Sequence, residues 1–414
     1  MKKAIITLCC IVATPLAYSG GYRVSVQGQK ALGMGHAGVA MTNSAEAVFF
    51  NPGALTELKE DFQLVSGLTL IDTKNRYQNV DTGSSAETDT PLGTPVNFYL
   101  AKRYSDKMSF GFGLYTPYGS VVEWEKDWVG SHLINEIDLQ SIFLQPTIAY
   151  KINDKVSIGG GPIVTISAVE LNRNLNTSLQ DSNGNRSNVQ LEDSNIIDFG
   201  FNLGAFFDVS EKVNVGVNYR SEIIVKSEGD ADFRDVPGPF QSVFVDGGYT
   251  AELPLPAELT LGLTYQVNDR LLLAADYNYT FWDVYEDLTF EFDSVTDPDR
   301  AVSVNPRNYK NSSTYRFGME YAKSDKLTFR TGFYYDQTPI RDGYFAPETP
   351  RADSLGFTGG ITYKVSKKLA LDFSALYLYF DEEDNSYDFN DAGVFEGSYK
   401  VRAYALGFGL TYNF

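Results

Sequence analysis

The sequence predicts an all-β protein, a 14-stranded antiparallel transmembrane β-barrel with an N-terminal hatch inside its lumen. Three observations lead to this fold class. Apolar and polar residues alternate with period two almost everywhere after residue 60, short polar turns of one kind recur along the chain, and residues 21–58 fit neither pattern. We expect residues 59–414 to form the barrel wall and residues 20–58 to form a tail and hatch (plug) that fill it.

Residues 1–19 are typical of a secretory signal peptide. A charged start at Met1-Lys2-Lys3 precedes a short apolar run, and small residues stand at Ala17 and Ser19. The run is too short for a membrane-spanning helix. Because Cys9 and Cys10 both lie within it, the exported chain is expected to hold its fold without disulfides.

The charge and composition favour an outer-membrane protein of a Gram-negative bacterium. The formal charge is −19, and loss of Lys2 and Lys3 with the signal peptide changes it to −21 (−19 − 2). So acidic a chain has no electrostatic reason to bind nucleic acid. Its 27 Tyr and 28 Phe, in an exported chain without a long apolar helix, are typical of membrane barrels.

The alternation separates apolar from polar faces along individual segments. Residues 327–335 place mostly Leu and aromatic side chains on one face and Arg330 on the other, and residues 369–375 separate Leu and Phe from Asp372. A soluble sandwich would turn the apolar face toward a dry core. A membrane barrel turns it toward lipid and keeps the charges in the lumen.

Six short turns share a polar tip, a cation and an apolar strand start, and in five of them an aromatic residue stands shortly before the turn. They lie 42 to 58 residues apart, whereas two membrane-spanning strands need only about 20 to 24 residues. Long loops must therefore lie at the opposite end, as in outer-membrane barrels. The turns are Ser105-Asp106-Lys107, Asn153-Asp154-Lys155, Ser210-Glu211-Lys212, Asn268-Asp269-Arg270, Ser324-Asp325-Lys326 and Ser366-Lys367-Lys368.

Six turns join twelve strands, and one further strand at each end gives fourteen. The terminal aromatic, Phe414, is typical of a strand that the barrel-assembly machinery recognises, and the long loops are expected to meet lipopolysaccharide. We expect a monomer. The expected strands are 61–72, 94–104, 107–116, 138–151, 155–168, 195–209, 212–225, 249–267, 270–282, 312–322, 326–337, 353–365, 368–380 and 398–414.

The N-terminal segment resembles a known hatch. Gly33-x-Gly35-x-Ala37-Gly38 followed by Asn51-Pro52-Gly53-Ala54-Leu55 is similar to the hatch of the FadL/TodX (OmpP1) family of outer-membrane transporters for long-chain fatty acids and other hydrophobic compounds. Further similar segments at 124–130, 253–259 and 332–340 extend the resemblance over the whole mature chain. The family usually has Ala where this chain has Gly53.

The resemblance implies a gated route for hydrophobic molecules. Substrate is captured among the extracellular loops, binds inside the barrel against the N-terminus, and leaves after a hatch movement or through a kink in the third strand. The residues implied are the gate Asn51, Pro52, Gly53 and Ala54, the ligand-contacting tail Gly20, Gly21, Tyr22 and Arg23, and the kink at Gly111 and Gly113. Pro52 restricts the hatch backbone and Asn51 can cap it.

Several charged residues are expected in the lumen. Both signs are interleaved, so pairing between wall charges is the simple interpretation; in the alternative, Arg220, Arg316 or Arg330 contacts an anionic headgroup. Trp124 and Trp128 lie in the second loop, where they either anchor at the membrane interface or begin an apolar capture surface.

No enzyme is expected. The two histidines, His36 and His132, lack a neighbouring Ser/Asp arrangement, and no metal-ligand spacing appears, so no cofactor or metal is predicted. The predicted function is a hatch-gated outer-membrane transporter for fatty acids or other hydrophobic small molecules. A general diffusion porin and a loop-displaying surface barrel remain the alternatives.

Overall fold

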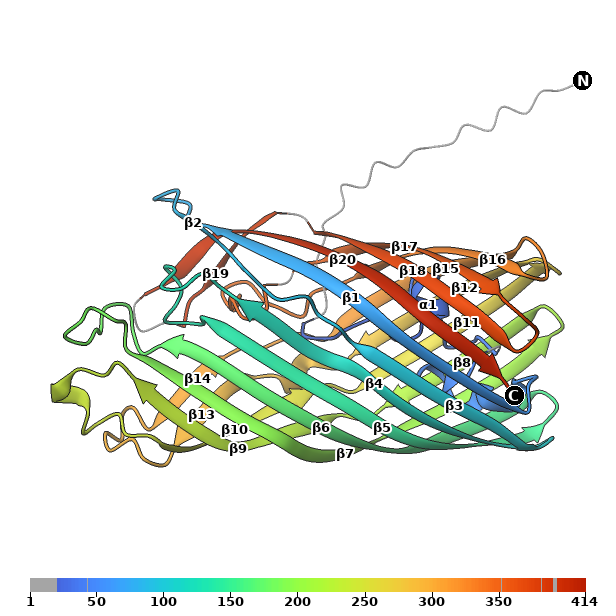
Figure 1. Ribbon diagram of the computed structural model, residues 1–414, viewed down its shortest axis with the longest axis horizontal. Coiled ribbons are helices and arrows are strands. Elements are labelled where there is room, and N and C mark those ends of the chain that lie inside the picture. Colours follow the sequence, from blue (N-terminus) through green and yellow to red (C-terminus); the bar gives the residue numbers. More distant parts are fainter. Residues whose placement is uncertain (1–20, 43, 351, 381, 390–392) are drawn as a thin grey trace, which may run out of the picture.

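A computed structural model describes residues 21–414 except 43, 351, 381 and 390–392, so the predicted signal peptide and Gly20 lie outside the described residues. The wall is a single closed antiparallel sheet (Figure 1). Its strands are β1 Phe62–Gln78, β2 Ser85–Glu87, β3 Val96–Ser105, β4 Met108–Glu123, β5 Glu136–Asn153, β6 Val156–Asn174, β7 Asn188–Ser210, β8 Val213–Arg220, β9 Ile223–Arg234, β10 Gly247–Leu255, β11 Glu258–Asn268, β12 Leu271–Thr280, β13 Asp287–Phe292, β14 Val302–Pro306, β15 Ser312–Ala322, β16 Leu327–Asp336, β17 Ser354–Lys364, β18 Leu369–Phe380, β19 Glu383–Tyr387 and β20 Phe395–Asn413.

These segments make fourteen wall strands, which confirms the prediction. β8 and β9 are two parts of one wall strand, as are β10 and β11, and β2, β13, β14 and β19 extend the wall into the loops. The barrel closes where β1 pairs with β20, from Gln63 opposite Asn413 to Gln78 opposite Ser398. The described wall therefore has no free edge along this seam.

The structure corrects the predicted strands in two respects. Several strands run beyond the membrane into segments expected to be loops, such as β7, which begins at Asn188 instead of 195. The seventh and eighth wall strands, predicted as continuous, are each broken, at residues 221–222 and 256–257. The predicted strands carried one alternation through these residues, whereas Arg220 and Ile223 face the same side although they are three residues apart.

The two faces of the wall follow the alternation. Outward positions carry exposed apolar rings and chains, for example Phe333, Phe357 and Phe408, while the residues between them point into the lumen. This inverted distribution is expected where the outer surface meets lipid. No helix in the described part of the chain is long and apolar enough to cross a membrane.

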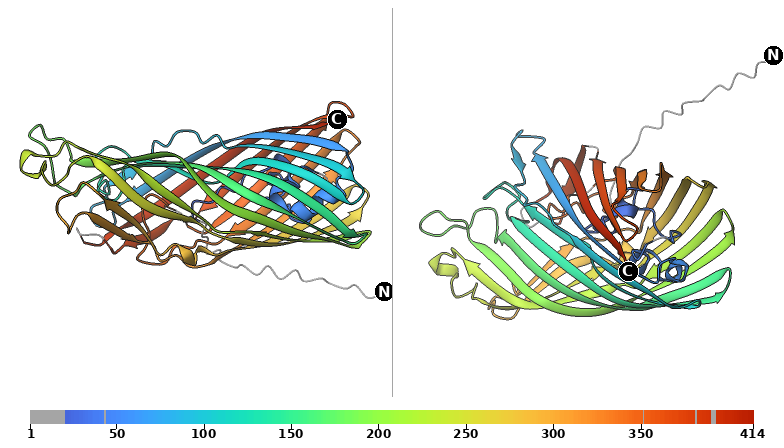
Figure 2. Two further views of the ribbon diagram at one scale, coloured as in Figure 1. Left: turned by 90° about the horizontal axis from the view of Figure 1, so that it is seen from below. Right: turned by 45° about the vertical axis from the view of Figure 1, so that its right-hand side comes forward.

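Residues 21–58 lie inside the barrel as a compact plug with little regular structure (Figure 2). It contains α1 Gln29–Leu32, α2 Ala47–Phe50 and the 3-10 segment η1 Pro52–Glu57. Most of its residues are buried. η1 packs on β5, β6 and β7 near their short-turn ends, so the hatch lies toward that end of the lumen.

Candidate functional site

Asn51 fixes the hatch to itself and to the wall. Its side chain is fully buried and accepts a hydrogen bond from Gly53 N at 3.0 Å, which caps η1. The same amide donates to Val39 O at 2.8 Å and to the wall carbonyl of Ala205 at 3.0 Å. One side chain therefore joins two hatch segments to β7.

The wall beneath Pro52 is made of glycines. A Cβ at Gly159 would lie 2.6 Å from the Pro52 carbonyl carbon, and a Cβ at Gly204 would lie 2.8 Å from its ring. We call Gly159, Gly204 and Gly216, which meets Val39, the hatch seat. A Cβ at Gly53 would approach the Gly204 and Ser157 carbonyls to 3.0 Å, so Gly53 allows a closer fit than an alanine would.

Gly111 and Gly113 also receive the hatch, and they do not mark the kink of the third wall strand. Both lie in regular register with β5, and a Cβ at Gly111 would lie 2.6 Å from Val48. The irregularity in β4 falls between Tyr115 and Tyr118. The kink position is therefore displaced by several residues from the predicted one, toward Pro117, which cannot donate to a ladder.

The N-terminal tail covers this irregularity from inside. Val24 N donates to Pro117 O at 2.8 Å, Gly119 N donates to Tyr22 O at 3.1 Å, and Gln27 Nε2 donates to Thr116 O at 2.8 Å. The tail thus acts as a short extra strand that satisfies backbone groups of β4 left over at the bulge.

A cavity of about 370 Å³ adjoins the same part of β4. It extends from residues 90–96, which lead into β3, to the upper half of β4 and β5, and Val24 of the tail and Tyr118 line its inner side. β3 begins only at Val96, and its pairing with β4 ends at Asn97 opposite Tyr115. The part of β4 beyond Tyr115 therefore has no partner in β3. We call this space the side cavity.

Tyr22 forms the base of a narrow apolar cavity above the tail. The other lining residues include Leu139, Val225, Leu253 and Phe290. Tyr22 packs edge-on against Trp282 at 4.9 Å between ring centroids, and its hydroxyl donates to Pro254 O. Burial raises the pKa of Tyr22 well above its ordinary value, so the phenol stays neutral.

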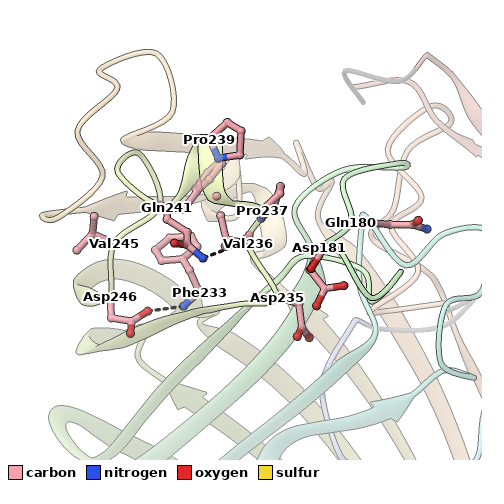
Figure 3. A pocket seen from close by; sticks show the side chains of 13 residues that line it. Gln180, Asp181, Phe233, Asp235, Val236, Pro237, Pro239, Gln241, Val245 and Asp246 are labelled. Carbon is pink, nitrogen blue, oxygen red and sulfur yellow. Dashed lines mark hydrogen bonds between the residues drawn. The ribbon is translucent and has the colours of Figure 1, made fainter.

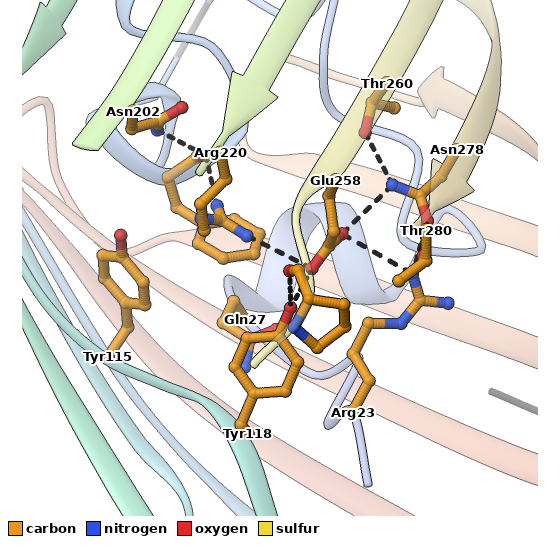
Figure 4. Close-up of polar contacts among 12 residues, drawn as sticks. Arg23, Gln27, Tyr115, Tyr118, Asn202, Arg220, Glu258, Thr260, Asn278 and Thr280 are labelled. Carbon is orange, nitrogen blue, oxygen red and sulfur yellow. Dashed lines mark hydrogen bonds and ion pairs between the residues drawn. The ribbon is translucent and has the colours of Figure 1, made fainter. Parts of the chain in front are cut away.

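Arg23 holds the tail to the opposite wall (Figure 4). Its guanidinium pairs with Asp336 at 2.9 Å and with Glu258 at 3.5 Å, and donates to Thr314 and Thr280 at 2.7 and 3.0 Å. Burial alone would lower the pKa of Arg23, but Asp336 and Glu258 raise it above its ordinary value. The buried cation is therefore stable only while these carboxylates surround it.

A small polar chamber lies between the tail, the hatch and the wall. Arg23, Arg220 and Arg316 line it together with Glu258 and His36. Arg220 pairs with Glu258 at 3.5 Å and donates to Phe49 O at 3.1 Å, whereas the Nε atoms of Arg220 and Arg316 have no hydrogen-bond partner in the described residues.

The chamber favours negative charge. His36 is neutral, because burial and the nearby Arg316 and Arg23 lower the pKa of the imidazole well below its ordinary value. Three guanidinium groups line the chamber with one carboxylate, Glu258, and Asp336 and Asp276 outside the lining offset part of this positive charge. Arg330 lies elsewhere, paired with Glu320 at 2.7 Å near the short-turn end.

The two tryptophans of the second loop do not form an exposed capture surface. Trp124 and Trp128 are 3% and 5% exposed and stack at 4.3 Å between ring centroids. Their indole N–H groups donate to Pro347 O and Ile134 O at 3.1 and 2.8 Å. They are the core of the packed loops, which the sequence could not distinguish from an interface.

A cleft of about 770 Å³ opens instead at the loop tips (Figure 3). The loop around Gln180 and Asp181 forms one side, and residues 233–246 form the other. Phe233, Val236 and Phe244 give this loop cleft apolar surface, while Asp235 and Asp246 stand at its margin. Nothing in the sequence pattern singled it out, because its apolar residues lie in one loop and only the fold sets the loop around Gln180 opposite them.

Other residues of the site were missed for the same reason. Tyr118 donates to Glu258 at 3.0 Å, Asp336 pairs with Arg23, and Trp282 packs on Tyr22. Alternation could place Asp336 and Tyr118 on the lumen face, but only the fold shows that the tail meets them. Burial lowers the pKa of His132 in the second loop to about 4, so its imidazole is neutral.

The chain matches a known family over nearly its full length. The model for "Outer membrane protein transport protein (OMPP1/FadL/TodX)" matches residues 10–414. This chain belongs to that family. The predicted family, the outer-membrane location and the absence of enzymatic function are thereby confirmed: the chain is an outer-membrane transport barrel.

Individual relatives agree over their whole lengths. Outer membrane protein P1 of Haemophilus influenzae is 24% identical, with all of both chains covered. The long-chain fatty acid transport protein of Escherichia coli K12 is 20% identical over 100% of this chain and 98% of that one. Among solved structures, a Pseudomonas aeruginosa FadL homologue aligns with a TM-score of 0.82 at 21% identity, covering 95% of this chain and 100% of that one. The Ralstonia pickettii toluene transporter TbuX aligns at 0.71 and 19%, covering 97% and 100%.

Proposed function

We propose that this family member takes up long-chain fatty acids or similar amphipathic hydrophobic molecules, and that its N-terminal tail and hatch gate the route. One observation carries the proposal. Tyr22 forms the base of the apolar cavity, while the next residue, Arg23, lies in the polar chamber with Arg220 and Arg316. Displacement of two tail residues would join an apolar slot to a cluster of guanidinium groups.

This arrangement suits an amphiphile. An acyl chain gains free energy by leaving water for the apolar cavity, and its carboxylate can take charge-assisted hydrogen bonds from the chamber. Arg316 is the best candidate for the first contact, because Arg23 and Arg220 already pair with carboxylates, whereas no ion pair joins Arg316 to a described residue. The loop cleft is the proposed place of first capture, and the side cavity beside the β4 bulge a proposed exit.

We also propose that the protein is a monomer, that its last strand carries an assembly signal and that its long loops contact lipopolysaccharide. The closed seam between β1 and β20 supports a self-contained monomer. Phe414 stacks on Phe62 at 4.4 Å at the end of the last strand, where a barrel-assembly signal would be read. Contact of the long loops with lipopolysaccharide is proposed from their position. Loss of residues 1–19 as a signal peptide is proposed from the sequence alone.

Competition binding tests the proposal. The purified protein is titrated with a fluorescent fatty acid and competed with oleate or with an uncharged hydrocarbon such as toluene. Arg316→Met is expected to weaken oleate binding about 10- to 100-fold, the loss of one charge-assisted hydrogen bond, and to leave toluene binding unchanged. Lys74→Met on the outer part of the wall is the matched control.

Equal loss for both ligands would show that Arg316 is structural and would contradict carboxylate recognition. Planar-bilayer conductance addresses the porin alternative. A large steady conductance of the wild-type protein would favour an open porin over a gated route. A loop-displaying barrel predicts no change in uptake when residues 21–58 are deleted from a correctly folded protein.

A further inference from the structure

The barrel wall is interrupted where β7 meets β8 and β9. β7 pairs with β8 through residues 202–210 and with β9 through residues 188–192, and no ladder pair of the described chain joins the stretch between. On their other side β8 and β9 keep one register with β11 and β10, from Arg220 opposite Glu258 to Ile223 opposite Leu255. The interruption is therefore one-sided.

A mismatch of inward and outward positions explains it. Arg220 and Ile223 are both buried and face the lumen although they are three residues apart, so this wall strand switches face at residues 221–222. β7 also switches which face points inward, at Asn195, whose φ is +62°. Asn195 does not lie opposite residues 221–222, where the neighbouring wall strand switches. Between the two switches a ladder would set inward residues against outward ones, which antiparallel pairing does not allow.

Side chains take the place of the missing ladder. Asp193 Oδ2 accepts from Glu228 N at 2.8 Å and from Ser227 Oγ at 3.0 Å. Phe201 N donates to Ser221 Oγ at 2.9 Å, and Ser221 N donates to Phe201 O at 2.9 Å, a single backbone bond at the lower end of the gap. Such isolated contacts open at lower free energy than a cooperative ladder, so this is a weak part of the wall.

One layer of apolar side chains closes the lower part of the gap. Ile223 lies over Gly200, where a Cβ would stand 2.6 Å from Ile223 Cγ1. Ile223 is 2% exposed, and its neighbour Val225 lines the apolar cavity. On the outer side Phe199 is 71% exposed and faces lipid. Val225 thus lines the apolar cavity, and Ile223, the preceding inward residue of β9, closes the gap over Gly200.

We propose that this gap is a second side portal, through which the hydrocarbon chain of a hydrophobic substrate passes between the apolar cavity and the membrane, with Ile223 as the movable closure. Phe201 lies nine residues from Ser210 at the short turn. A strand needs about 9 to 11 residues to cross the membrane, so Phe201 lies near the far side and the portal meets the outer leaflet. It lies in a different part of the wall from the side cavity. The nature of the cargo rests on the proposed function.

The first test needs no substrate. Cysteine is placed in the otherwise cysteine-free mature chain, as Ile223→Cys or Leu255→Cys, in protein reconstituted into phosphatidylcholine vesicles. The two positions lie opposite each other, face the lumen and are almost equally buried, but only Ile223 borders the gap. A bilayer-confined pyrene maleimide is expected to label Ile223→Cys about tenfold faster, because a few missing ladder bonds lower the opening free energy. Equal labelling rates would overturn the portal.

The second test closes the gap with an engineered disulfide bond. Gly200→Cys with Ile223→Cys places two Cβ atoms within disulfide range. Oxidation is expected to remove most of the fatty-acid uptake, and a reductant is expected to restore it. Ile361→Cys with Phe373→Cys, opposite each other in the continuous β17–β18 ladder, should have no such effect.

Full uptake by the disulfide-linked protein, with wild-type uptake intact, would overturn the portal and leave the proposed function standing. Absence of uptake in the wild-type protein would instead count against the proposed function. In that case the labelling comparison between Ile223→Cys and Leu255→Cys still decides whether the gap opens to the membrane.

Discussion

The hatch and the tail are neighbouring parts of one plug, yet they are held in opposite ways. The hatch rests on backbone: Pro52 lies against Gly159 and Gly204, and the amide of Asn51 bonds main-chain groups. The tail rests on side chains, through the ion pairs of Arg23 and the ring contacts of Tyr22. Backbone contacts fitted through glycine tolerate little displacement, because protein interiors are close-packed.

The difference indicates which part moves. An anionic ligand could compete for Arg23 with Asp336 and Glu258, whereas no ligand group replaces the fit of Pro52 on its seat. We therefore place the proposed first gating step in the tail at Tyr22-Arg23, and treat Asn51-Pro52-Gly53-Ala54 as the part that holds the plug while the tail shifts.

The largest effect is expected at the tail. Arg23→Gln should destabilise tail docking by about 3–5 kcal/mol, because two buried carboxylates lose their partner. Hydrogen exchange at residues 22–27 should accelerate, while barrel folding, measured by heat-modifiable migration, stays unchanged. The double variant Arg23→Gln/Asp336→Asn should recover part of the loss. Wild-type exchange in Arg23→Gln would show that ring packing alone holds the tail.

The hatch should lose stability as the pH rises toward neutrality. Burial raises the pKa of Glu46 from 4.5 to about 7; Lys30 and Arg330 oppose the rise and Asp372 adds to it. An acid with a raised folded-state pKa gives most stability below pH 4.5 and loses it as the pH rises through 7. Glu46→Gln should therefore stabilise the hatch by an amount that grows to about 3 kcal/mol above pH 7.

Hydrogen exchange of residues 44–57 between pH 5 and 8, corrected for intrinsic rates, measures this difference. His36 titrates in the opposite sense, since its pKa is lowered and its neutral form is lost only on acidification. The comparison of Glu46→Gln with wild type cancels that contribution. A difference that does not change with pH would contradict the assignment to Glu46.

A smaller effect is expected at the hatch seat. Gly204→Ala places a methyl group against Pro52 and Asn51, which should displace η1 at a cost of about 1–3 kcal/mol. Single-channel recordings should show brief openings that the wild-type protein lacks. Gly359→Ala, where a Cβ meets nothing within 4 Å, is the control. Silent recordings from Gly204→Ala would mean that the hatch tolerates displacement after all.

The smallest effect is expected from replacing Asn51 or Pro52 in the hatch. Asn51→Ala removes hydrogen bonds to Val39, Ala205 and Gly53 and should destabilise hatch packing by about 1–2 kcal/mol. Pro52→Ala keeps these bonds and should cost about 1 kcal/mol or less. Transport at wild-type rates in both variants would support the tail as the gate, whereas strongly altered transport in Asn51→Ala would return that role to the hatch.

The sequence predicted the fold better than the site, for physical reasons. Fourteen strands followed from a lipid-facing pattern and repeated turns, both of which are local. Contacts such as Arg23 with Asp336, separated by 313 residues, depend on barrel closure and leave no local trace. The kink was predicted at Gly111 and Gly113, but the irregularity lies between Tyr115 and Tyr118. The two glycines make room for the hatch instead, and a glycine in a sequence does not show which of these two purposes it serves.

The closed seam between β1 and β20 has a consequence for assembly. The plug is encoded first and the closing strand last, and sixteen consecutive pairs join residues 63–78 to 398–413. A plug enclosed so fully must already be in place, or still threaded through an open wall, when β20 arrives. The order of the chain thus allows the interior to be filled before the container is sealed.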